Sequence, residues 1–150
     1  MEGILSRMEE VGLEDRLLVL VDENENESEM LDSTYEFDCG ARMTEKLLDN
    51  YPQCTAIIAV NDMTAMGCIS VLNQRGVRIP EDMAICGFDN LYLDRMMQPQ
   101  LTSVEQMAFH GCKVGLSILL EKMKNFSMEE SPVYMEYKPR LYARGSTVKE

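Results

Sequence analysis

The strongest constraint on the fold is a strand, helix, strand pattern over residues 55–90. The apolar run 56–60 ends at Asn61, and a helical pattern follows it directly. A second apolar run over 83–88 ends at Asp89. Such units build open parallel sheets, and ligands bind beyond the carboxyl ends of parallel strands. Asn61 and Asp89 are therefore the first candidate ligand-binding residues.

The amino-terminal part continues the alternation of helices and strands. The spacing of apolar residues predicts helices over 2–11, 36–50 and 61–76. Five consecutive aliphatic residues at 17–21 predict a buried strand.

The carboxyl-terminal part adds one long helix and two short strands. Ser103 and Gln106 have the spacing of a capping box, which predicts a long helix that reaches Lys124. Short strands are expected over 133–137 and 141–144. The order of elements predicts an α/β fold with an open parallel sheet flanked by helices.

Composition and charge exclude several functional classes. The 150 residues are 45% hydrophobic and 27% charged, as in a soluble globular domain. No apolar run approaches the roughly 18 residues of a membrane span, and no signal peptide is visible at the amino end of the given sequence, so a cytoplasmic protein is expected. A net charge of −12 without a run of Lys or Arg predicts that this chain alone does not bind DNA.

Metal, cofactor and enzyme functions have no support in the sequence. The five cysteines are scattered and the chain has one histidine, so reduced thiols are expected and neither a metal nor a cofactor site is. The acidic stretch 23–29 is expected to be a solvated loop, because it lacks the glycine and bidentate glutamate of an EF-hand. No nucleophile elbow, glycine-rich phosphate loop or Cys/His pair is present, so no enzyme is expected.

Several spaced motifs resemble those of one family, the lac repressor and gal repressor family of bacterial transcription regulators. The motifs are TAIIAVNDMTAMG at 55–67, GVRIPEDMAICGFDN at 76–90, PQLTSV at 99–104 and PRLYARGST at 139–147. Their order and number make the match specific, and it covers essentially the whole chain. The resemblance implies the effector-binding core, which is similar to periplasmic sugar-binding proteins.

The resemblance implies only the carboxyl-terminal part of that core. Residues 1–100 and 133–147 would belong to its second lobe and 101–125 would be a helix of the first lobe, with 125–132 as a flexible join. By this resemblance the helix-turn-helix, the hinge and most of the first lobe would be absent from the given sequence. An arginine expected to contact the effector would precede Met1. We therefore expect effector binding to be weak or absent in this chain.

Three residues match effector-binding positions of the family. Asp89 would accept hydrogen bonds from effector hydroxyls or amines, since a carboxylate accepts two donors at once. Asn61 would hydrogen-bond the effector, and Tyr35 would stack on a sugar or base. Alternatives are a loop carboxylate for Asp89, a helix cap for Asn61 and simple packing for Tyr35. Asp62 is expected to be structural. Asp22 is a further candidate effector-binding residue, only because it directly follows the strand predicted at 17–21.

The resemblance also implies self-association. Met66, Leu93 and Met97 fall where the family dimerises; the alternative for the methionines is the core of the chain itself. The long helix would lack its first-lobe partner, so a homodimer, another oligomer or an exchange of elements is expected. The implied function is sensing of a small molecule, a sugar, coupled to DNA binding in the intact regulator. The alternative is a stand-alone sugar-binding protein of a transport system.

Overall fold

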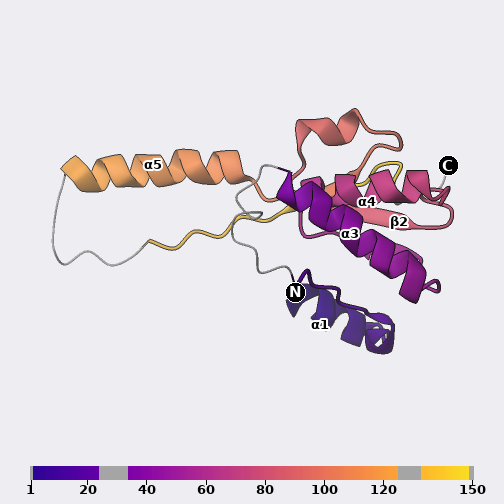
Figure 1. Ribbon diagram of the computed structural model, residues 1–150. Coiled ribbons are helices and arrows are strands. Elements are labelled where there is room, and N and C mark those ends of the chain that lie inside the picture. The colour runs from indigo at the N-terminus through magenta and orange to yellow at the C-terminus, as the bar shows by residue number, and fades with distance from the viewer. Residues whose placement is uncertain (1, 24–33, 125–132, 149–150) are drawn as a thin grey trace.

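A computed structural model describes residues 2–23, 34–124 and 133–148, and an α/β fold is observed (Figure 1). In chain order the elements are α1 (Glu2–Glu10), the 3-10 helix η1 (Glu14–Arg16), α3 (Tyr35–Asn50), β1 (Ala56–Ile58), α4 (Asp62–Gln74), β2 (Ala84–Phe88), the 3-10 helix η2 (Tyr92–Arg95), β3 (Thr102–Glu105), α5 (Ala108–Lys124) and β4 (Arg140–Tyr142). The predicted strand, helix, strand unit is confirmed as β1, α4 and β2.

The four strands form one sheet in the order β1-β2-β3-β4. The first three strands are parallel, with Ile57 opposite Ile85 and Gly87 opposite Ser103. β4 runs antiparallel to β3. The predicted open parallel sheet is therefore correct for three strands, and the fourth makes the sheet mixed.

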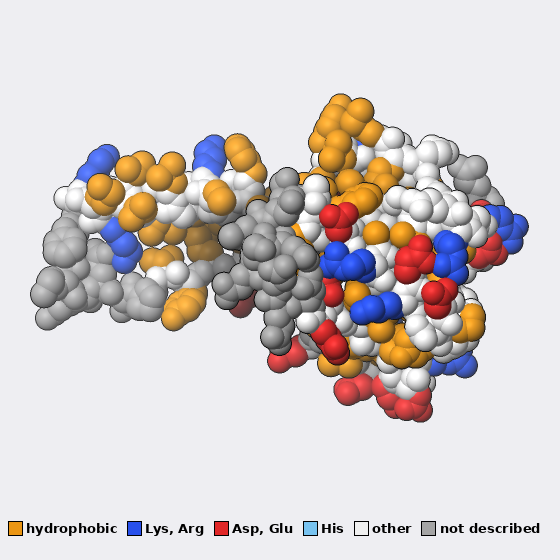
Figure 2. Space-filling model, viewed as in Figure 1, with side chains coloured by type: hydrophobic (Ala, Val, Ile, Leu, Met, Phe, Trp, Pro, Cys, Tyr) orange, Lys and Arg blue, Asp and Glu red, His pale blue; other side chains and the backbone are white. Residues whose placement is uncertain are grey.

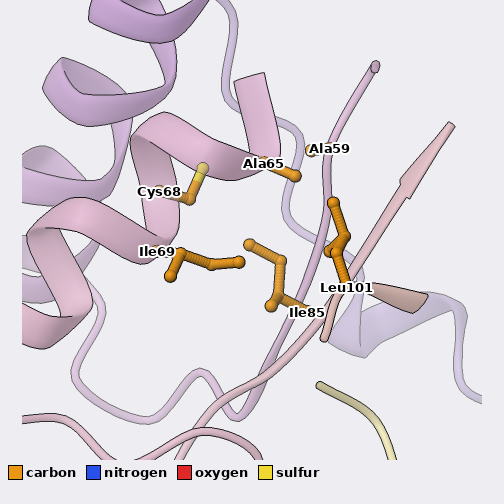
Figure 3. Packing of buried hydrophobic residues seen from close by; sticks show 6 residues of the cluster. All are labelled: Ala59, Ala65, Cys68, Ile69, Ile85 and Leu101. Atoms are coloured by element: carbon orange, nitrogen blue, oxygen red, sulfur yellow. The ribbon is translucent and has the colours of Figure 1, made fainter. Parts of the chain in front are cut away.

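The main core lies between α4 and the sheet. Its buried residues come from α4, the strands and their flanks, and six of them point toward one another in Figure 3: Ala59, Ala65, Cys68, Ile69, Ile85 and Leu101. A second cluster joins Leu47 of α3 with Leu72 and Met83. α4 buries Ala65, Cys68, Ile69 and Leu72, which recur at helical spacing and therefore lie on one face of the helix.

Two glycines allow α3 and α4 to approach closely. A Cβ on Gly40 would lie 2.1 Å from the carbonyl oxygen of Thr64, and one on Gly67 would lie 1.9 Å from that of Phe37. Only a residue without a side chain fits such a contact. Because Gly40 meets Thr64 while Leu47 meets Leu72, the two helices run in the same direction.

The segment after β4 joins two of the strands. Ser146 Oγ donates to the carbonyl of Ile85 at 2.6 Å and accepts from the backbone N–H of Thr102 at 2.8 Å. The backbone of Ser146 also accepts from Ile85 N–H at 2.9 Å. Ser146 is fully buried and links β2 to β3 near the start of both strands.

Two predicted strands are wrong. Residues 17–21 form no regular structure, and Val19 and Val21 are 45% and 69% exposed. Leu20 packs beside the second core cluster, but the segment pairs with no described strand, and a strand needs that pairing. Residues 133–137 likewise form no strand, and the strand predicted at 141–144 is observed as β4 at Arg140–Tyr142.

The predicted capping box is also wrong. Thr102–Glu105 forms β3, and α5 begins only at Ala108. The hydroxyl of Ser103 donates to Asp62 at 2.6 Å instead of capping a helix. Pairing with β2 and β4 satisfies the backbone of this segment, and its branched residues suit a strand.

Two apolar surfaces have no cover among the described residues. α5 projects away from the sheet in Figure 1 and has no buried residue; Leu116 and Met123 are 57% and 69% exposed. On the sheet, Ile58 and Phe88 are exposed on the face opposite the core. Residues 24–29 of the predicted acidic loop and the predicted flexible join at 125–132 lie outside the described residues.

Candidate functional site

The candidate site lies at the edge where β1 and β2 end. Asn61 follows β1, and Asp89 follows β2, which is parallel to it. A hydrogen bond of 2.9 Å from Leu91 N–H to Asp62 Oδ2 ties the two strand exits together. α3 runs in the same direction as α4, so Tyr35, its first residue, lies toward the same edge. The structure therefore brings the three predicted effector-binding residues to one end of the sheet.

Asn61 caps α4. Its backbone is extended, and its side-chain oxygen accepts the N–H of Thr64 at 2.8 Å. This satisfies one of the N–H groups that a helix leaves unpaired at its start. The cap uses the oxygen of the amide, so the NH2 group is the part of Asn61 that could donate to a ligand.

Asp62 is structural, as the sequence predicts. Its side chain is fully buried, and its two oxygens accept from Ser103 Oγ at 2.6 Å and Leu91 N–H at 2.9 Å. The neighbouring strand leaves room for it, because a Cβ on Gly87 would lie 2.2 Å from Asp62 Oδ1. Asp62 thus joins α4 to β3 and to the turn after β2.

Asp89 stands in an unusual backbone conformation at the exit of β2. Its φ is 119°, that of Asn90 is 56°, and both lie in the region that side chains rarely adopt. The N–H of Asp89 donates to Val104 at 2.8 Å, and the N–H of Asn90 donates to Ser103 Oγ at 3.0 Å. These bonds to β3 hold the turn and fix where the Asp89 carboxylate lies.

Gln106 is a site residue that the sequence interpretation missed. Its side-chain N–H donates to Asp89 Oδ1, so a ligand that binds Asp89 meets Gln106 as well. Sequence reasoning assigned Gln106 to a helix cap. Recognition of 102–105 as a third strand would have placed Gln106 at the same sheet edge as Asp89.

Tyr35 belongs to a polar cluster at the start of α3. The guanidinium of Arg42 lies 5.9 Å from the centre of its ring, and Arg42 pairs with Asp22 at 2.5 Å. Partial burial and the negative charge of Asp22 raise the pKa of Tyr35 above its ordinary value. Asp22 therefore sits beside Tyr35 and holds Arg42.

The predicted dimer residues have different surroundings. Met66 is half-buried on α4, and Met97 packs against the main core. Leu93 is 48% exposed in η2, beside Tyr92 and Met96, which are 76% and 70% exposed. Figure 2 shows hydrophobic side chains gathered on this protrusion. The exposed apolar surface at this end of the molecule therefore centres on η2.

The described ranges 2–23, 34–124 and 133–148 contain neither a metal-binding cluster nor a membrane-spanning helix. No group of three or more His, Cys, Asp or Glu side chains there could hold a metal ion. No helix in those ranges is both long and apolar enough to cross a membrane. All five cysteines carry free thiols.

The chain matches the family described as periplasmic binding protein-like domain over residues 1–147. It is 35% identical to the HTH-type transcriptional repressor PurR of Vibrio cholerae over 125 residues, which are 83% of this chain and 36% of that protein. It is also 35% identical to catabolite control protein A of Priestia megaterium over 121 residues, 81% of this chain and 36% of that protein. The chain thus spans little more than a third of the length of these relatives.

A solved structure with a bound sugar is similar to this one. The LacI family transcriptional regulator from Enterococcus faecium, with bound ribose, superposes with a TM-score of 0.75 and 28% identity. The match covers 97% of this chain and 49% of that one.

Proposed function

We propose that this chain senses a small polar metabolite, a sugar. The premise is that the chain belongs to the periplasmic binding protein-like domain family and is part of the effector-binding core of a LacI-family regulator. The observation that carries the proposal is the placement of Asp89 and Asn61 at one edge of the sheet, with Tyr35 at the start of α3 toward the same end. A carboxylate, an amide and an aromatic ring are the groups that proteins use to bind sugar hydroxyls and the apolar face of a sugar ring.

Asp89 is the main ligand contact in this proposal. It is half-buried, its backbone is fixed by β3, and one of its oxygens already accepts an amide N–H from Gln106. A carboxylate can accept further donors, so two neighbouring hydroxyls of a sugar suit it. The similar Enterococcus faecium regulator holds ribose, which supports a sugar as the class of ligand.

The intact regulator would couple this site to DNA. α5 has no buried residue, and we assign it to a first lobe that packs on its apolar side. A ligand between two lobes would favour one arrangement of them, and a dimer would pass that change to helix-turn-helix domains. The same division leaves residues 1–100 and 133–147 as the second lobe and makes ligand binding by this chain alone weak.

The relatives favour a regulator over the alternative. PurR is a transcriptional repressor, and the similar structures include LacI-family regulators, which does not favour a stand-alone transport protein. Those relatives are regulators rather than enzymes. The net charge of −12 assigns DNA contact to other parts of the regulator.

A thermal melt against sugars, sugar phosphates and nucleosides tests the proposal. A ligand at 100 times its Kd stabilises the native state by about 2.7 kcal/mol, which raises the midpoint by several degrees. We expect one compound class to raise it in the wild-type chain and Asp89→Ala to remove the response.

Asp49→Ala is the matched control. Asp49 is exposed near the end of α3 and pairs with Arg75 at 2.8 Å, so it lies toward the opposite edge of the sheet. This variant should keep the full ligand response. A response that survives Asp89→Ala would refute the assigned site, and no response even in a chain extended toward its amino terminus would refute the function.

A further inference from the structure

Asp94 is a buried carboxyl group without a hydrogen-bond partner. It lies in η2, its relative exposure is 0%, and neither side-chain oxygen has a partner within the described part of the chain. An ionised carboxylate in such a place is costly, because burial removes the water that would solvate it. Asp94 therefore requires a specific explanation.

Arg144 does not provide the missing hydrogen bond. Its Nη1 lies 3.5 Å from Asp94 Oδ2, which is long for such a bond. The same nitrogen donates to the carbonyl of Leu101 at 2.5 Å, and Nη2 donates to Asn90 Oδ1 at 2.5 Å. The guanidinium thus gives Asp94 a nearby positive charge while its hydrogen bonds go elsewhere.

Asp62 brings a second carboxyl group to the same place. It is fully buried on α4, and it accepts the N–H of Leu91 in the turn that leads into Asp94. Burial first, and then the charge of Asp62, raise the pKa of Asp94 to about 7, while Arg144 lowers it by less. Burial first, and then the negative charge of Asp62, raise the pKa of the Cys86 thiol in β2.

We propose that Asp94 is protonated in the folded protein and donates its carboxyl proton to Asp62, so that the two side chains form one hydrogen-bonded pair. The pair carries a single negative charge, which Arg144 balances. The proton supplies the partner that Asp94 lacks, and two buried carboxylates facing each other are avoided.

The pair positions the turn that carries Asp89. Asp62 accepts the N–H of Leu91, Arg144 holds the side chain of Asn90, and Asp94 itself lies three residues beyond Leu91. Both Asp89 and Asn90 need such support, since their backbone angles are unfavourable. Loss of the proton would place two like charges beside the turn and loosen it, so the fold becomes less stable as pH rises.

The variant Asp94→Asn tests the proposal. Its amide N–H can donate to Asp62 as the protonated carboxyl does, but it does not titrate. An unfolded aspartate has a pKa of about 3.9, so in the wild-type chain the native state alone holds the proton between about pH 4 and pH 7. Stability contributed by this proton is full below that window and is lost as pH rises through it.

Urea denaturation from pH 5 to pH 8.5 gives the measurement. The measured quantity is the ratio of the wild-type unfolding constant to that of Asp94→Asn. This ratio should rise about tenfold per pH unit between about pH 5 and 7 and stay constant above pH 7. Asp49→Asn, at an exposed ion pair, should show no such rise in this window. A wild-type to Asp94→Asn ratio that stays constant with pH would overturn the proposal.

A second measurement needs no variant. A 13C NMR titration of the aspartate side chains in the wild-type chain should show one carboxyl that titrates near neutral pH. Titration of every aspartate below about pH 5 would overturn the proposal even if Asp94→Asn failed to fold. Both measurements are made without ligand, so their outcome is independent of the proposed sugar sensing; only the influence on Asp89 as a ligand contact rests on that function.

Discussion

The variant Gly67→Ala tests the close contact between α3 and α4. The added carbon would lie 1.9 Å from the carbonyl oxygen of Phe37, whereas carbon and oxygen normally stay about 3.3 Å apart. The helices would therefore have to separate by about 1.4 Å. Overpacking costs about 1–3 kcal/mol, and a backbone obstacle favours the upper end. Replacement of glycine by alanine stabilises a helix by about 1 kcal/mol, so the free energy of unfolding should fall by about 2 kcal/mol in total.

Urea denaturation followed by circular dichroism measures this loss. With a slope of about 2 kcal/mol per M, the midpoint should fall by about 1 M. Gly115→Ala is the matched control, because Gly115 is also helical but has no atom within 4 Å of the added carbon. This control variant gains the same helix propensity, and its added carbon meets no other atom. Equal midpoints for the two variants would refute the close contact at Gly67.

Two further variants address the cap and the exposed protrusion. Asn61→Ala removes the oxygen that accepts Thr64 N–H and should cost about 1 kcal/mol in urea denaturation, while Asn61→Asp keeps that oxygen and should stay near the wild type. Equal losses in both would contradict the cap. Light scattering at high concentration should show self-association that Leu93→Asp weakens and that Leu18→Asp, at another exposed leucine, leaves unchanged. A wild-type chain that remains monomeric would contradict this role of η2.

The central unit was predictable because its signals are local. Apolar residues run consecutively through β1 and β2, Asn61 caps the helix between them, and Gly76 follows its end with a φ of 70°. The α/β fold and the meeting of Asn61 and Asp89 at one edge follow from this pattern. The family resemblance pointed to the same edge.

The remaining elements depend on partners far away in the sequence. Thr102–Glu105 becomes a strand because β2 and β4 pair with it, and residues 17–21 fail to become one because no described strand does. Asp94 gave no signal at all, since a carboxylate between exposed apolar residues of a loop looks solvated until Asp62 and Arg144 are seen around it. Gln106 was assigned to a helix cap for the same reason, because the strand pairing of Thr102–Glu105 is not visible in the local sequence.

The position of Ser146 constrains the order of events during synthesis. Its hydroxyl and backbone join Ile85 to Thr102, and the adjoining Arg144 fixes the turn after β2. Both residues are made some sixty positions after Ile85. Domains begin to fold as the chain emerges from the ribosome, at about 5–20 residues per second. For several seconds after β2 is made, the nascent chain therefore lacks the hydrogen bonds of Ser146 and Arg144, and the edge of β3 stays unpaired until β4 follows.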